Sequence, residues 1–286
     1  MFGTHLGIDL GTASILVYMQ GKGIVLQEPS VVAIDRDSGK RIAVGEEARM
    51  MLGRTPGNIT AIRPLRDGVI ADYETTEFML KYLLKKAGIR NWPFFKNKVI
   101  VCIPSGVTEV EERAVKQAAY NAGAGKVKVV EEPYVAALGA GLDINGPEGN
   151  IVIDVGGGTT DIAVLSLGGI VVKKNLRVGG DKLDEAIIRF IRREYNLLIG
   201  ERTAEEIKID IGCAIPEGRE DNKELEVKGR DLVTGLPKNL KINSKSIFPA
   251  MEEVIDSIIA GVKDVLERTP PELAADIMET GIIMTG

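Results

Sequence analysis

Short apolar segments bounded by glycines and polar turns make up the first part of the chain. They lie at 6–8, 15–19, 24–27 and 31–34, and two similar runs flank the three glycines at 156–158. Apolar runs of this length between turn residues predict buried β-strands joined by tight hairpins. We therefore expect consecutive strands at the start of the chain and the same arrangement near its middle.

Elsewhere, predicted strands alternate with predicted helices. Helices are expected at 75–87, from a Thr108-x-x-Glu111 capping box to about 122, at 135–142, and from just after Asp181 to about 195. Two more are expected, one that begins at a second capping box, Thr203-x-x-Glu206, and one along the apolar stripe at 251–266. Further strands are expected at 99–103, 127–130, 170–178 and 281–284. This alternation predicts an α/β fold with βαβ units and a largely parallel sheet.

One supersecondary unit occurs twice. Asp9-Leu10-Gly11-Thr12-Ala13-Ser14 and Asp154-Val155-Gly156-Gly157-Gly158-Thr159-Thr160-Asp161 each lie between two apolar runs. Both copies then reach a glycine turn and another Ile-Val strand. A repeat of this kind predicts two similar halves that face each other, each with a hairpin loop and an aspartate.

The residues of these loops suit a bound nucleotide. Consecutive glycines cost backbone entropy, and their usual use is close approach of the backbone to a phosphate. Two carboxylates near phosphates suit Mg²⁺, which prefers oxygen ligands. The repeat therefore predicts a nucleoside triphosphate with Mg²⁺ between the halves. For the loop at 154–161 taken alone, an ordinary glycine-rich hairpin is the alternative.

Composition narrows the function classes. The net charge of -5 argues against a nucleic-acid binder. The single histidine, His5, excludes a His-based metal site or a Ser-His-Asp triad, and the two isolated cysteines favour a reducing compartment. No apolar run reaches the ~18–20 residues of a membrane span. We expect two domains, 1–146 and 147–286, with small inserts at about 35–70 and 180–247.

Three aromatic residues gather around a proline in a predicted loop. Trp92, Phe94 and Phe95 flank Pro93, with cationic neighbours on both sides. Aromatic residues beside cations in a loop suit a membrane-interface anchor or a protein contact. Packing back onto the neighbouring helix is the alternative, and the residues themselves do not favour either.

The chain lacks the G-x-x-x-x-G-K-[ST] and G-x-G-x-x-G signatures, which argues against a P-loop and a Rossmann site. The duplicated loops, with Glu131-Glu132-Pro133 between them, resemble the actin-like ATPase superfamily. Within it the chain resembles the MreB family from end to end. The segments that carry this resemblance are 7–13, 53–58, 68–73, 111–114, 151–160, 229–237 and 269–277.

The resemblance implies a duplicated actin-like (ribonuclease-H-like) α/β fold around a nucleotide cleft. It implies that Asp9 and Asp154 hold hydrated Mg²⁺, and that Glu132 and Thr159 orient the attacking water, with Glu131 as the alternative to Glu132. The remaining implied nucleotide contacts are Gly11, Thr12, Ala13, Ser14, Gly156, Gly157, Gly158, Gly179, Gly180, Asp181, Glu205 and Lys208. From the residues alone, a solvated helix face is the favoured explanation of Glu205 and Lys208.

The implied function is that of a bacterial actin that binds ATP or ADP, hydrolyses ATP slowly and polymerises. Its partners would be further copies of itself, the inner face of the cell membrane through Trp92, Phe94 and Phe95, and membrane-bound cell-shape proteins, in the cytoplasm. Ser14 and Asp161 depart from the Asn and Glu usual in the family, and family chains continue past Thr285-Gly286, so we expect a C-terminal part of the fold to be missing. A small-molecule kinase or a chaperone-type ATPase of the same superfamily is the alternative.

Overall fold

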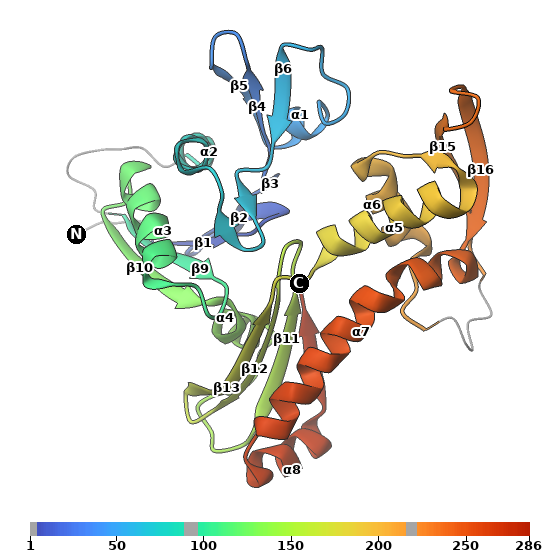
Figure 1. Ribbon diagram of the computed structural model, residues 1–286. Coiled ribbons are helices and arrows are strands. Elements are labelled where there is room, and N and C mark those ends of the chain that lie inside the picture. The colour runs from blue at the N-terminus through green and yellow to red at the C-terminus, as the bar shows by residue number, and fades with distance from the viewer. Residues whose placement is uncertain (1–4, 89–96, 216–221) are drawn as a thin grey trace. The chain divides into compact units, whose positions relative to one another are not determined.

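The computed structural model describes residues 5–88, 97–215 and 222–286 (Figure 1). It divides into two compact units, one formed by Met1–Arg177 with Asp264–Gly286 and the other by Val178–Lys263. We describe each unit by itself. The boundary at 146/147 follows from the sequence repeat rather than from this division, and it stays a prediction.

The first unit contains a five-stranded mixed sheet. In spatial order its strands are β10 (Lys126–Glu131), β9 (Lys98–Ile103), β1 (His5–Leu10), β2 (Ser14–Met19) and β3 (Gly23–Pro29). Pairing is parallel across β10, β9 and β1, and antiparallel across β1, β2 and β3. A largely parallel sheet was therefore the wrong expectation for this part, because strands joined by tight hairpins can only pair antiparallel.

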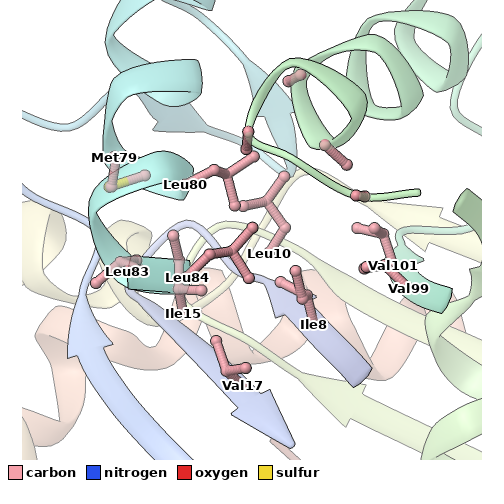
Figure 2. Close-up of a cluster of buried hydrophobic side chains, with 14 of the residues drawn as sticks. Ile8, Leu10, Ile15, Val17, Met79, Leu80, Leu83, Leu84, Val99 and Val101 are labelled. Atoms are coloured by element: carbon pink, nitrogen blue, oxygen red, sulfur yellow. The ribbon is translucent and has the colours of Figure 1, made fainter. Parts of the chain in front are cut away.

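Helices α2 (Tyr73–Lys86) and α3 (Glu109–Asn121) supply the apolar cover of this sheet. Figure 2 shows Leu80 and Leu84 of α2 among the strand residues Ile8 and Leu10, in a cluster of buried side chains. The predicted capping box of α3 is confirmed: the Glu111 amide donates to Thr108 Oγ1, and the Thr108 amide donates to Glu111 Oε2 at 2.6 Å. The core thereby fixes the position of the first glycine loop, which follows β1.

A second sheet in the same unit repeats this topology. Its order is β13 (Gly169–Leu176), β12 (Thr160–Ser166), β11 (Asn150–Val155) and β17 (Ile282–Thr285). Strands β11–β13 pair antiparallel like β1–β3, and β17 lies parallel to β11 as β9 lies parallel to β1. Asp9 and Asp154 occupy matching places, since Asp9 faces Leu16 and Cys102 while Asp154 faces Asp161 and Thr285. The predicted duplication is thus visible in the strand register.

A small sheet with its own apolar cluster follows β3. It consists of β5 (Arg41–Val44), β4 (Val32–Asp35) and β6 (Ile59–Ile62), beside the short helix α1 (Glu46–Arg49). Val31, Ala33, Ala43 and Ala48 form its buried centre. The short pair β7 (Leu65–Arg66) and β8 (Val69–Ile70) then leads back to α2. The small insert expected at about 35–70 covers the same part of the chain.

Helix α4 (Glu132–Gly139) begins three residues earlier than expected. Pro133 lies in its first turn, where proline is favoured because its missing N–H would be unpaired in any case. Ala137 packs against Val152 and Ala163 of the second sheet, while α8 (Pro271–Thr280) lies near β11. The early start places Glu132 at the N-terminus of a packed helix rather than in a loop.

The second unit packs helices α5, α6 and the first part of α7 with a three-stranded sheet around its own core. Its elements are α5 (Gly180–Tyr195), β14 (Leu197–Leu198), α6 (Glu201–Ile211), β15 (Glu224–Asp231), β16 (Pro237–Asn243) and the first part of α7 (Ser244–Arg268). The buried cluster includes Ile187, Ile191, Ile207, Val227 and Met251. The insert expected at about 180–247 falls inside this unit.

Two helix starts in this unit differ from the expectation. Helix α6 begins at Glu201 after Gly200, so the Thr203-x-x-Glu206 capping box was wrong. Instead, Glu206 accepts a hydrogen bond from Arg202 within the helix. Helix α7 begins before 251, because Asn243 Oδ1 accepts the Ser246 amide at 2.9 Å and caps the helix there.

Candidate functional site

The first glycine loop is held from behind by Ser30. This fully buried residue donates its hydroxyl to the Gly11 carbonyl at 2.6 Å and its amide to the Ala13 carbonyl at 2.9 Å. These two hydrogen bonds engage the carbonyl oxygens of Gly11 and Ala13 and so hold the loop in place. Ser30 was not among the predicted site residues, and no local signal marks it, since it lies 19 residues from Gly11.

The second glycine loop closes tightly and touches the first. The Gly156 amide donates to the Thr159 carbonyl at 2.9 Å, which completes the hairpin between β11 and β12. A Cβ atom on Gly157 would lie 2.5 Å from Ala13 Cβ, and one on Gly158 would lie 2.4 Å from Thr12 Oγ1. The glycines are therefore required first by the approach of the two loops to each other.

Thr12 is part of the contact between the two loops. Its side chain is buried, and its hydroxyl oxygen accepts the Gly68 amide at 3.0 Å. A Cβ atom on Gly68, which has a positive φ of 75°, would lie 2.8 Å from Thr159 Cγ2. Gly68 is thus a third glycine at the junction, although its segment had been noted only as part of the family resemblance.

A cavity of about 560 Å³ lies beside the joined loops, within the first unit. Its lining brings together most of the predicted phosphate and metal residues: Asp9, Gly11, Thr12, Ala13, Ser14, Glu132, Asp154, Gly156, Gly157, Gly158 and Thr159. Gln27, Gly68, Cys102, Pro104, Val135, Ala136, Thr285 and Gly286 line it as well. The two copies of the repeat therefore share one cavity.

Asp9 and Asp154 carry uncompensated negative charge into this cavity. Burial, and then the charge of Asp154, raise the pKa of Asp9 to about 6. Burial also raises the pKa of Asp154, while the Thr285 hydroxyl, 3.1 Å from its Oδ1, opposes the rise. Two half-buried carboxylates that repel each other gain from a shared cation.

The donor set fits Mg²⁺ bound together with phosphates. Among the described residues, no group of three or more His, Cys, Asp or Glu side chains forms a metal site. Mg²⁺ does not need one, because it usually keeps several waters and takes one or two carboxylates plus substrate phosphates. Asp9 and Asp154 are two carboxylates of the kind such a site would use.

Glu132, and not Glu131, faces the cavity. Burial, and then the charges of Asp9, Asp161 and Asp154, raise the pKa of Glu132 to about 9. The Glu131 carboxylate instead pairs with Lys173 at 2.6 Å. The two neighbouring glutamates therefore have different environments, and Glu132 is the one placed beside the loops.

These raised pKa values predict how stability depends on pH without nucleotide or metal. A carboxyl group whose folded pKa lies above its unfolded pKa binds more protons when folded, so stability falls as pH rises through that interval. Each group contributes up to about 1.4 kcal/mol per pH unit there. We expect a lower melting temperature at pH 8.5 than at pH 6, measured by calorimetry. Glu132→Gln should flatten this slope, and a melting temperature that rises over the range would contradict the assignment.

Two further side chains, Cys102 in the cavity lining and the buried Asp161 outside it, were not assigned roles from the sequence. Asp161 is buried, and burial raises its pKa to about 6 even though the Ser105 amide and Asn175 donate to it. Burial and the charges of Asp9 and Glu132 raise the pKa of the Cys102 thiol to about 12. Cys102 is therefore a neutral wall of the cavity and not a nucleophile.

Gly179, Gly180, Asp181, Glu205 and Lys208 all lie in the second unit. Gly179 and Gly180 form the N-terminus of α5. Lys208, on α6, donates to the Gly180 carbonyl at 3.1 Å and pairs with Asp184 Oδ1 at 2.9 Å. The structure thus joins Lys208 to the Gly179–Gly180 turn, while the role of these residues toward an adenosine stays a prediction.

The Lys208–Asp184 pair should stabilise the second unit. Both side chains are mostly buried, and burial raises the pKa of Asp184 to about 6 while Lys208 opposes the rise. Removing the cation leaves a buried carboxylate unpaired, so Lys208→Met should cost about 1–3 kcal/mol in the free energy of unfolding. Arg202→Met, which breaks the exposed Arg202–Glu206 pair on the same helix, should cost less than about 1 kcal/mol. Equal losses in urea unfolding would contradict the structural role of Lys208.

The proposed membrane contacts Trp92, Phe94 and Phe95 lie outside the described residues. Within the part of the chain that the structure describes, no helix is both long and apolar enough to cross a bilayer.

Comparisons with known proteins agree with the fold. The family profile described as "MreB/Mbl protein" matches residues 3–286. The chain is 54% identical to the cell shape-determining protein Mbl of Bacillus subtilis over 286 residues, which cover 100% of this chain and 85% of Mbl. It is 50% identical to the cell shape-determining protein MreB of Escherichia coli over 290 residues, covering 100% and 83% of the two chains.

Solved structures show the same fold. The crystal structure of MreB5 of Spiroplasma citri bound to ADP superposes with a TM-score of 0.92 at 41% identity, covering 99% of this chain and 84% of that one. The same protein bound to AMPPNP gives a TM-score of 0.93. A MamK double helical filament, at 23% identity and a TM-score of 0.80, supports the actin-like fold alone. The duplicated α/β architecture, the paired glycine loops and these full-length similarities show that the chain belongs to the MreB/Mbl family of actin-like proteins.

Proposed function

We propose that the chain is an ATP-binding cytoskeletal protein that hydrolyses ATP slowly, polymerises and serves cell shape. One observation carries the proposal: both glycine loops, both aspartates and Glu132 line a single cavity. The nucleotide-bound structures of MreB5 and the cell-shape names of Mbl and MreB support it.

The nucleotide phosphates would lie against the two loops. The backbone amides of 11–14 and 157–159 supply donors without adding positive side chains, while the Gly156 amide is bonded to the Thr159 carbonyl. Asp9 and Asp154 would hold Mg²⁺, mostly through its waters, and this ion would neutralise phosphate charge. Because the charges of Asp9 and Asp154 raise the pKa of Glu132, a cation beside them lowers that pKa and favours the glutamate anion.

Glu132 and Thr159 would position the attacking water from opposite sides. Glu132 is anchored at the start of α4 and Thr159 by the hairpin bond to Gly156. In phosphoryl transfer, catalysis comes mainly from positioning and charge stabilisation, so a carboxylate and a hydroxyl suffice for a slow ATPase.

The function is tested by light scattering and electron microscopy of the purified protein with ATP and Mg²⁺, together with phosphate release. We expect filaments and slow release of phosphate without any added acceptor. A protein that stays monomeric at high concentration, with and without lipid, would overturn the proposal. A small-molecule kinase would instead need an acceptor, and the family assignment does not favour it.

We further propose that the filaments lie at the inner face of the membrane, in the cytoplasm, with membrane-bound cell-shape proteins as additional partners. The aromatic and cationic residues around Pro93 support a surface anchor, since aromatic rings partition to the bilayer interface. Replacing Trp92, Phe94 and Phe95 by serine should release the protein from liposomes in a co-sedimentation assay. A Phe78→Ser variant at the partly buried face of α2 is the control for loss of fold. Unchanged co-sedimentation of the triple variant would refute the anchor.

A further inference from the structure

Asp161 has two hydrogen bonds that join separate parts of the first unit. Its Oδ1 accepts the Ser105 amide at 2.7 Å, 56 residues away, and its Oδ2 accepts the Asn175 side-chain amide at 2.8 Å. Only 1% of Asp161 is exposed to solvent. Both carboxylate oxygens are therefore engaged, one with the turn after β9 and the other with the neighbouring strand β13.

The repeat shows that the fold does not require a carboxylate at this position. Asp161 pairs across the hairpin with Asp154, and the matching partner of Asp9 in the other copy is Leu16. A leucine thus occupies the equivalent strand position in the first copy. The Asp161 carboxylate in the second copy therefore has a role other than forming the hairpin.

The position of Asp161 connects it to Thr159. Thr159 ends the glycine loop, and Asp161, two positions later, is the second residue of strand β12. Ser105 follows Pro104, which lines the cavity. A Cβ atom on Gly68 would approach both Pro104 Cγ, at 2.6 Å, and Thr159 Cγ2, at 2.8 Å, so Pro104 and Thr159 border the same close-packed spot.

We propose that Asp161 is a positioning residue for ATP hydrolysis, which holds the Pro104–Ser105 turn against the Thr159 segment. The bond to Ser105 fixes the wall beside Thr159, and the bond to Asn175 fixes the orientation of the carboxylate. Because Glu132 lies between the two copies of the repeat and Thr159 lies in the second copy, the distance between them depends on contacts that join these two parts of the chain. Asp161 supplies such a contact without touching the nucleotide. This inference rests on the proposed ATPase function.

The decisive variant is Asp161→Asn. Its oxygen can still accept the Ser105 amide, but the hydrogen bond to Asn175 loses its charge and requires Asn175 to turn its carbonyl toward the new amide. A displacement of about 1 Å at a reacting group can cost roughly 100-fold in rate. We expect phosphate release at saturating ATP to fall about 10- to 100-fold, while the Kd for AMPPNP with Mg²⁺ changes less than about threefold.

Exchanging the pair provides the rescue. In the double variant Asp161→Asn with Asn175→Asp, the new asparagine donates to the new aspartate and still accepts from Ser105, so hydrolysis should return to within about threefold of the wild type. The matched control is Ser166→Ala on the same strand, which removes a buried hydrogen bond to the Pro147 carbonyl away from the cavity and should leave hydrolysis unchanged.

Three results decide the matter. Slower hydrolysis with intact AMPPNP affinity, restored by the exchange, supports positioning. Parallel losses of hydrolysis, affinity and melting temperature, or no rescue by the exchange, would overturn it in favour of a purely structural role. A wild-type protein that releases no phosphate would instead refute the proposed function, which separates the two failures.

Discussion

Replacing Gly157 by alanine should weaken nucleotide binding roughly 5- to 150-fold. The added Cβ would lie 2.5 Å from Ala13 Cβ and 3.1 Å from the Ala13 amide nitrogen, so the two loops must separate. Overpacking of this kind costs about 1–3 kcal/mol, and about 1.4 kcal/mol corresponds to a factor of ten in affinity. Titration calorimetry with AMPPNP and Mg²⁺ measures the effect.

Gly139→Ala is the matched control for this prediction. Gly139 lies in the last turn of α4 in the same unit, and a Cβ there would meet nothing within 4 Å. Its affinity should equal that of the wild type. If Gly157→Ala also bound AMPPNP normally, the contact between the loops would not set the shape of the phosphate site.

Exchanging Glu132 for glutamine should slow phosphate release about 100-fold or more while leaving the Kd for AMPPNP nearly unchanged. Glutamine keeps the size of the side chain but cannot become an anion that accepts a proton from water, and a positioned base typically contributes about 10²- to 10⁴-fold. Single-turnover hydrolysis, with affinity measured separately, distinguishes the two effects.

The adjacent glutamate offers an internal comparison. Glu131→Gln removes only the carboxylate that pairs with Lys173, outside the cavity lining. Its hydrolysis should remain within about threefold of the wild type. Equal losses in affinity and rate for Glu132→Gln would mean that Glu132 supports the structure rather than the reaction.

Much of the candidate site could be predicted because its signals are local. The two Asp-Gly loops, the apolar runs beside them and the Thr108-x-x-Glu111 box each occupy a few consecutive residues. Strand periodicity and capping depend on neighbours along the chain, so they survive as sequence patterns. Helix starts were less reliable: Gly200 and Asn243 precede helices α6 and α7 in places that the apolar stripes alone did not indicate.

Residues that act through distant partners left no such signal. Ser30 stabilises the first loop from 19 positions away, and Thr285 donates to Asp154 across 131 positions. Asp161 had been noted only as a departure from the family pattern, yet it connects Ser105 and Asn175. These roles depend on which strands become neighbours.

The sequence by itself determined the α/β class, the internal repeat and the pairing of two glycine loops with two aspartates. These follow from short-range periodicity and from the few residues that allow close backbone approach. Only the tertiary structure decided that Glu132 rather than Glu131 faces the cavity, that the loop glycines are needed for contact with Thr12 and Ala13, and that Asp161 bonds to Ser105. The physical reason is that burial, hydrogen bonding and steric contact belong to neighbours in space, and here those neighbours come from both copies of the repeat.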